Sequence, residues 1–138
     1  MLCFENPAGC ILLHPTFVQV IWARGERQDE HVMELMNQLL EVGKQHHLDR
    51  LLVDQEIMQS CSIEVEVWFK YDWLTRARQQ FDFGAAAILS GRSLLVRLAT
   101  TGFLRHLLGW TGTFQIRVFS AGEQQQAIEW LSQPSPRA

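Results

Sequence analysis

The sequence lacks the features that mark several specialised classes of protein. Its formal net charge of −3 gives no basic surplus of the kind that binds nucleic acid. No apolar run approaches the ~20 residues that a membrane-spanning helix requires, and the N-terminus has no basic segment followed by a signal-type apolar core. Its three cysteines, Cys3, Cys10 and Cys61, show no close-paired spacing, which argues against a disulfide framework. We therefore expect a cytoplasmic protein with no nucleic-acid partner and no integral membrane segment.

Recognisable cofactor and catalytic motifs are also missing. The histidines show no HExxH spacing and no pairing with cysteine, and the adjacent His46 and His47 are explained as a surface pair at a helix end. There is no glycine-rich phosphate loop, no dinucleotide fingerprint and no Ser/His/Asp order. Asp54 and Glu56 are close in sequence, but a turn residue and a solvated side chain explain them more simply. We expect no metal, no cofactor, no catalytic residue and no enzymatic activity.

What the sequence does contain is an alternation of short apolar runs with helix-length patterns. Residues 85–90 predict a central strand that is apolar on both faces. Ser120 and Glu123 fit a capping box at the start of the last helix. The other predicted strands are 10–14, 16–23, 50–54 and 114–119. The predicted helices are 29–45, 62–81, 94–108 and a short one around 127–131.

The resulting order of elements is ββαβαβαβα. Strands that alternate with helices predict an α/β fold with a mainly parallel sheet, right-handed crossovers and one antiparallel N-terminal strand. At 138 residues the chain has the size of one domain, so we expect a single domain over 1–138. We expect its ends, 1–9 and 133–138, to be loosely ordered.

Apolar residues on two of the predicted helices exceed what one core face requires. On the helix 62–81, one face is expected to carry the core residues Ile63, Val67, Leu74, Ala77 and Phe81. The helix 94–108 is apolar almost all round, and such a helix needs cover on more than one side. Neighbouring helices of the same chain, a partner subunit, an apolar ligand or a membrane surface would each supply that cover. The candidates for an interaction surface are Trp68, Phe69, Trp73, Phe103, Leu104 and Leu107.

A second candidate site lies where the predicted parallel strands end. The loops after Asp54, Ser90 and Phe119 should leave the sheet along one edge, because each follows a strand of the same direction. Backbone donors at helix starts, together with a guanidinium, can hold a carboxylate or phosphate. A plain turn with Ser93 as a helix cap is the simpler interpretation. The candidates for an anion site are Ser60, Ser62, Gly91, Arg92 and Ser93.

Cys61 lies in the same region, near the predicted start of the helix 62–81. A position at a helix N-terminus lowers the pKa of a thiol and favours the reactive thiolate. However, no histidine or second cysteine lies near Cys61 in the sequence. We therefore favour the interpretation of an inert, partly buried cysteine.

The closing stretch FQIRVFSAGEQQQAIEWL, with the order and lengths of the elements, resembles the SpoIIAA-like group of the STAS superfamily. That superfamily is named for sulfate transporters and anti-sigma-factor antagonists. The matching features are Arg117-Val118-Phe119 in the last strand and Ala127-Ile128-Glu129-Trp130-Leu131 in the last helix. The resemblance implies a single-domain bacterial protein that has the STAS fold and works by docking on partner proteins.

The phosphorylation motif of that family is absent from this chain. Antagonists of the family carry Asp-Ser-Ser-Gly or Asp-Thr-Ser-Gly at the start of the helix after the third strand. The corresponding stretch here is Gln59-Ser60-Cys61-Ser62. Glu64 and Glu66 would also repel an added phosphate. We therefore expect that Ser60 and Ser62 are not regulatory phosphosites.

Two functions from different classes are consistent with these observations. The first is a non-enzymatic binding or regulatory module that contacts another protein, or itself as a homodimer, through the helices 62–81 and 94–108. The alternative is a carrier or sensor of a small apolar or amphipathic acid, with Arg92 facing the acid. A cavity lined by Trp68, Trp73, Phe103 and Leu107 would favour the carrier. A filled core with an exposed apolar patch would favour the docking module.

Overall fold

The computed structural model describes residues 1–24, 27–55, 61–80, 84–90, 115–120 and 122–133. The predicted helix 94–108, with Phe103, Leu104 and Leu107, lies outside these residues. In chain order, the described elements are β1 (Leu2–Asn6), β2 (Gly9–Leu13), β3 (Val18–Trp22), α1 (Asp29–Gln45), β4 (Arg50–Asp54), α2 (Ile63–Trp68), the π-helical turn η1 (Phe69–Trp73), α3 (Leu74–Gln80), β5 (Ala85–Leu89), β6 (Gln115–Phe119) and α5 (Gln124–Leu131). None of the described helices is long and apolar enough to cross a membrane.

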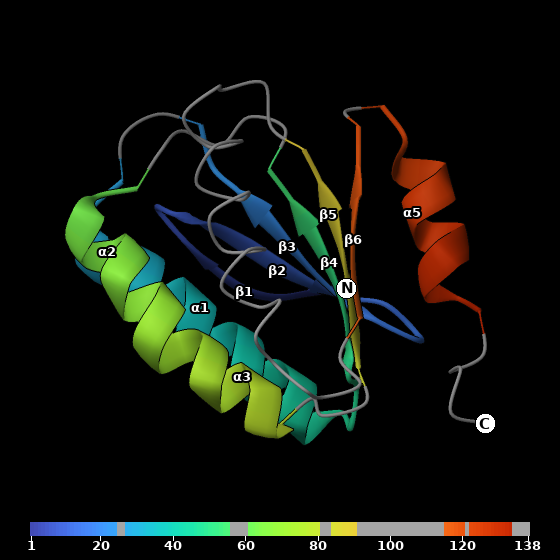
Figure 1. Ribbon diagram of the computed structural model, residues 1–138, viewed down its shortest axis with the longest axis horizontal. Helices are drawn as coiled ribbons and strands as arrows, with labels where there is room; N and C mark the ends of the chain where they lie inside the picture. Colours follow the sequence, from blue (N-terminus) through green and yellow to red (C-terminus); the bar gives the residue numbers. More distant parts are fainter. Residues whose placement is uncertain (25–26, 56–60, 81–83, 91–114, 121, 134–138) are drawn as a thin grey trace.

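The six described strands form one twisted sheet in which each strand lies beside its neighbour in sequence (Figure 1). β2 pairs antiparallel with both β1 and β3, whereas β3, β4, β5 and β6 pair in parallel. β2 is therefore the strand that runs against the others. This arrangement confirms the predicted α/β class and the mainly parallel sheet with its antiparallel N-terminal part.

Helices cover both faces of this sheet. α1, α2, η1 and α3 lie along one face, and α5 lies on the other (Figure 1). Successive strand residues point to opposite faces, so Leu51 packs in the cluster beneath α1 and α3 while Leu52 packs with Ala127 and Leu131 of α5. This two-sided burial explains why β4 is apolar at consecutive positions.

The prediction of a loose N-terminus over 1–9 is wrong, because β1 forms a hairpin with β2. Asn6 organises the turn: its Oδ1 accepts a hydrogen bond from the Ala8 amide at 2.8 Å, and its Nδ2 donates to the His31 carbonyl of α1 at 2.9 Å. A β-carbon on Gly9 would overlap the carbonyl oxygen of Ile21, so only glycine fits at the start of β2. β1 was missed because backbone and turn hydrogen bonds define it, and its sequence has no strong apolar alternation.

Candidate functional site

The helical segment after β4 changes its winding in the middle. Residues Ile63–Trp68 and Leu74–Gln80 are α-helical, but Phe69–Trp73 form a π-helical turn. A π turn accommodates one more residue than an α turn, so it rotates the following residues relative to the preceding ones. Trp73, the last residue of the π turn, and Leu74, the first residue of α3, are both buried.

Trp73 belongs to the core, contrary to the prediction that it lies on an interaction surface. Its side chain is only 4% exposed, and its indole Nε1 donates a hydrogen bond to the Met36 carbonyl of α1 at 2.8 Å. Its ring stacks on Phe69 with 4.9 Å between the ring centroids. Trp73 therefore fills the space between α1 and η1 with its polar atom satisfied.

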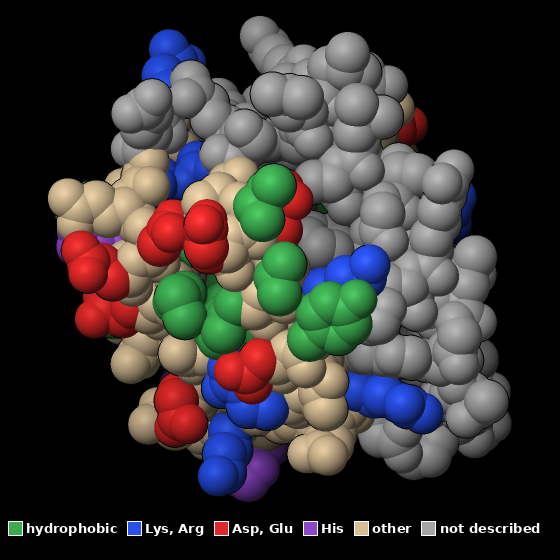
Figure 2. Space-filling model, turned by 60° about the vertical axis from the view of Figure 1, so that its left-hand side comes forward, with side chains coloured by type: hydrophobic (Ala, Val, Ile, Leu, Met, Phe, Trp, Pro, Cys, Tyr) green, Lys and Arg blue, Asp and Glu red, His purple; other side chains and the backbone are tan. Residues whose placement is uncertain are grey.

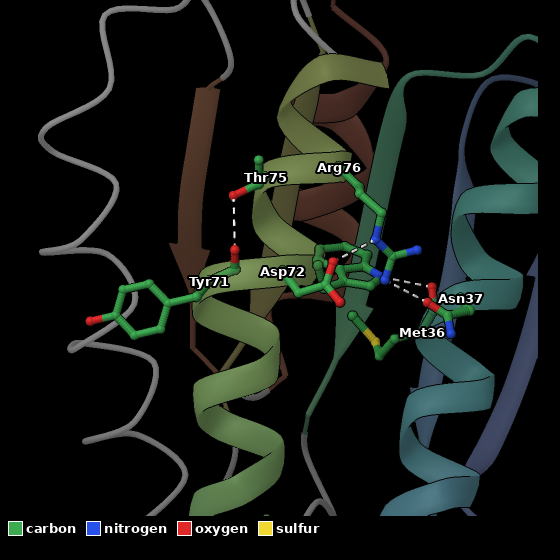
Figure 3. Close-up of polar contacts among 7 residues, drawn as sticks. Met36, Asn37, Tyr71, Asp72, Thr75 and Arg76 are labelled. Atoms are coloured by element: carbon green, nitrogen blue, oxygen red, sulfur yellow. Dashed lines mark hydrogen bonds and ion pairs between the residues drawn. The ribbon is translucent and has the colours of Figure 1, made fainter.

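Trp68 and Phe69, two further interaction-surface candidates, are half-buried and pack against the same core cluster. The Arg76 guanidinium lies 5.8 Å from the Trp68 ring centroid. Figure 3 shows Arg76 reaching from α3 to Asp72 and to Asn37 of α1, at 3.0 Å and 2.8 Å. Both aromatic residues are therefore partly covered by the core, and Trp68 also lies next to Arg76.

The exposed apolar side chains of this segment are instead Ile63, Val67 and Tyr71, which we call the outer stripe. They are 73%, 52% and 63% exposed, so the prediction that Ile63 and Val67 belong to a core face is wrong. They recur every four residues, which places them along one side of the helix. Figure 2 shows hydrophobic side chains gathered on the helical side of the molecule, with acidic and basic side chains around them.

Charged residues border the outer stripe. Glu64 and Glu66 lie in the first turn of α2, where the helix dipole favours negative charge. The ammonium group of Lys70 lies 5.5 Å from the Tyr71 ring centroid, and Asp72 forms an ion pair with Arg76. The stripe therefore has an apolar centre and a charged border of both signs, which is the composition of many protein interfaces.

The carboxyl ends of three parallel strands meet at one edge of the sheet, which confirms the predicted alignment. Asp54 lies beside Leu89, and Leu89 lies beside Phe119. The Ser90 amide then donates to the Phe119 carbonyl at 2.8 Å. The loops that follow these strands thus start along one edge.

Of the predicted anion-site residues, the structure describes only Ser62. Its hydroxyl accepts a hydrogen bond from the Val65 amide at 3.1 Å and caps α2. Ser60, Gly91, Arg92 and Ser93 lie outside the described residues. The anion site therefore stays a prediction, and the observed role of Ser62 is structural.

Arg27 is a residue at this edge that the sequence analysis missed. Its guanidinium donates to the Ala23 carbonyl at 3.0 Å, lies 5.5 Å from the Trp22 ring centroid and is 3.8 Å from the Cys61 Sγ. Arg27 and Cys61 are 34 residues apart in sequence, and Arg27 lies in a charged stretch without a motif. Only the fold brings the two side chains together.

The Cys61 thiol is kept in its neutral form. Burial raises its pKa, and the nearby Arg27 guanidinium opposes that rise without cancelling it. A thiol with a raised pKa is a poor nucleophile at neutral pH, which agrees with the interpretation of an inert cysteine. Among the described residues, no group of three His, Cys, Asp or Glu side chains is placed to hold a metal ion.

The sequential mixed sheet, with helices on both faces and a final R-V-F strand leading into α5, defines a protein of the STAS fold. More particularly, the chain belongs to the SpoIIAA-like family, whose sequence profile matches residues 19–132. No curated protein matches the chain. Members of this family are generally regulatory or binding modules.

Proposed function

We propose that this protein is a non-enzymatic regulatory module that docks on another protein through the outer stripe of α2 and η1. The observation that carries this proposal is the exposure of Ile63, Val67 and Tyr71 on one side of a helix. Large apolar side chains that lie together on a surface commonly mark an interaction site. The family points in the same direction, because its fold serves binding and regulation.

The packing around Trp73 supports docking over the alternative, a carrier of a small apolar or amphipathic acid. A carrier requires a cavity beneath the helices, but Trp73, one of its predicted lining residues, is buried in the core and stacks on Phe69. The other predicted lining residues, Phe103 and Leu107, lie outside the described part of the chain. The observed apolar surplus of α2 and η1 faces outward, as a docking surface requires.

Site-specific photo-crosslinking in the native host tests the proposal. A photoreactive amino acid at position 67 should give a covalent adduct with a protein. The same amino acid at position 125, which is an exposed glutamine on α5, serves as the control and should give none. Equal adducts at both positions, or none at position 67, would show that the outer stripe is not a docking surface.

Native mass spectrometry of the purified protein tests the carrier alternative directly. A docking module should give the mass of the chain or of its assemblies without added mass. A co-purified small acid in a stoichiometric amount would instead support the carrier and contradict the proposed function. The same spectra report the stoichiometry of any complex.

A further inference from the structure

We infer that Lys70 is the positioning residue of the outer stripe. Its charge excludes a uniform α-helix over residues 63–80, and the π turn that forms instead turns Ile63 and Val67 outward. The functional meaning of this inference rests on the proposed function, because it names the residue that presents the docking surface.

The second half of the helical segment is held in the core by its own contacts. Leu74 and Ala77 are buried, and the Trp73 indole donates a hydrogen bond to the Met36 carbonyl at 2.8 Å. These contacts fix which side of α3 faces inward. The side that α2 turns inward then depends on the winding between the two halves.

A uniform α-helix would carry Lys70 into the buried side. Position 70 lies four residues before Leu74 and seven before Ala77, and residues at these spacings share one face of an α-helix. A lysine at the edge of a buried face can reach water with its long side chain, but position 70 would lie at the centre of this face. Burying an ammonium group there without a partner is very costly.

The π turn removes this conflict by shifting the winding by one residue. The Leu74 amide donates to the carbonyl of Phe69, five residues earlier, whereas in an α-helix it would donate to the carbonyl of Lys70. Phe69 consequently takes the place on the buried side, where it packs against the core cluster and stacks on Trp73. Lys70 lies at the border of the outer stripe, with its ammonium group 5.5 Å from the Tyr71 ring centroid.

The same shift decides which apolar residues of α2 are exposed. Val65, four residues before Phe69, is buried, whereas Ile63 and Val67 are exposed. A uniform α-helix would reverse this arrangement, because Ile63 and Val67 would share the inward face with position 70. The charge of Lys70 therefore determines whether the outer stripe lies on the surface.

Thiol labelling of the purified full chain, mapped by mass spectrometry, tests the inference. Val67→Cys reports on the outward side of α2, and Val65→Cys reports on its buried side. Each reporter is compared with and without the second substitution Lys70→Leu, which removes the charge from the centre of the uniform face. We expect labelling at position 67 to slow at least about threefold and labelling at position 65 to speed up by a similar factor.

Two substitutions that should keep the wild-type pattern are the controls. Lys70→Arg retains the charge, and Lys44→Leu makes the same change at an exposed lysine of α1. Faster labelling at both positions together would indicate a local loss of structure in Lys70→Leu and overturns the inference. An unchanged pattern in Lys70→Leu also overturns it.

Thermal unfolding verifies that the variants fold, and Lys70→Met repeats the test with a more flexible apolar side chain. If the charge is what excludes the uniform helix, an apolar residue at position 70 must be compatible with folding. Failure of both Lys70→Leu and Lys70→Met to fold therefore overturns the inference as well.

These results are separable from the proposed function itself. If labelling reverses in Lys70→Leu but the photoreactive probe at position 67 gives no protein adduct, Lys70 sets the exposure of the stripe and the docking function is wrong. If the probe gives an adduct but labelling does not reverse, docking holds and Lys70 is not its positioning residue. If both hold, the yield of the adduct at position 67 should fall in Lys70→Leu together with the labelling.

Discussion

At the scale of single residues, Cys61 has a position that suggests a reactive thiolate, but the fold favours its neutral thiol. It lies one residue before the Ser62 cap of α2, where a helix dipole would favour the thiolate. Burial outweighs this effect and raises the pKa of the thiol, even though the Arg27 guanidinium lies 3.8 Å from the sulfur. The balance follows from desolvation, because a half-buried thiolate loses much of the water that would stabilise its charge.

The raised pKa of the Cys61 thiol predicts how the stability of the protein depends on pH. A thiol whose pKa is raised on folding holds its proton more tightly in the folded chain than in the unfolded chain. The free energy of unfolding should therefore fall as the pH rises above the ordinary thiol pKa of 9.0. Below that pH the thiol is protonated in both the folded and the unfolded chain, and its contribution to the free energy of unfolding is fully retained. Denaturant unfolding at a series of pH values up to 10 measures the slope.

The control for this prediction is Cys61→Ala, which removes the titrating group. Its stability should fall less steeply with pH than that of the wild type over the same range. The Cys10 thiol, whose pKa is also raised by burial, remains in both proteins and cancels in the comparison. Parallel profiles for the two proteins would contradict the proposed effect of burial on Cys61.

At the scale of elements, the π turn η1 explains why the helix was predicted at the right place but with the wrong buried face. The helix itself was predicted from 62 to 81, and α2, η1 and α3 occupy 63 to 80. Its faces were assigned with one uniform helical period, which put Ile63 and Val67 in the core and Trp73 outside. The π turn breaks that period. No local residue pattern predicts a π turn, so the buried face of α3 could not be related to that of α2 from the sequence.

Other elements were predictable where a local signal exists. Ser120 and Glu123 were predicted to form a capping box, and half of it forms: the Glu123 carboxylate accepts a hydrogen bond from the Ser120 amide at 2.7 Å. The Glu123 amide donates to the Ser120 carbonyl and not to its hydroxyl, and Glu123 itself is the N-cap of α5. β5 was predicted from a run that is apolar on both faces, and it is an interior strand that pairs with β4 and β6. The Arg27–Cys61 contact carries no such signal, because it joins residues from separate elements.

Trp73 should be the most costly residue of this helical segment to remove. Trp73→Ala would leave a cavity between η1 and α1 and delete the hydrogen bond to the Met36 carbonyl. We expect the free energy of unfolding to fall by about 3–5 kcal/mol. Tyr71→Ala, a neighbouring aromatic residue of the outer stripe, should change it by about 0.5 kcal/mol or less, because surface side chains contribute little.

Chemical denaturation of both variants measures this difference. If Tyr71→Ala were the more destabilising change, the assignment of Trp73 to the core and of Tyr71 to the surface would be wrong.

At the scale of the whole molecule, the described helices are divided unequally between the two faces of the sheet. One face carries α1, α2, η1 and α3, whereas α5 is the only described helix on the other (Figure 1). α5 has 8 residues, and so short a helix is not stable without tertiary contacts. Its apolar contacts come from Ala127 and Leu131, which pack against Leu52 and Leu89.

Arg50 adds a polar anchor that ties the end of α5 to the sheet. It is the first residue of β4, and its guanidinium donates hydrogen bonds to the carbonyls of Leu131 and Gln133. These carbonyls lie at the C-terminal end of α5, where a helix has unpaired acceptors and a negative dipole end. One side chain thus fastens the last helix to the first residue of a central strand.

Removing this anchor should loosen α5 selectively. Arg50→Met keeps most of the side-chain volume but leaves the two carbonyls without their charged donor, which we expect to cost about 1–3 kcal/mol. Hydrogen–deuterium exchange should therefore become faster in α5, while α1, which packs on the opposite face, should keep its protection. Arg24→Met, a change at an exposed arginine, serves as the control and should alter neither helix. Equal acceleration in α1 and α5 would show that Arg50 supports the whole fold and does not act as a local anchor for the C-terminal helix.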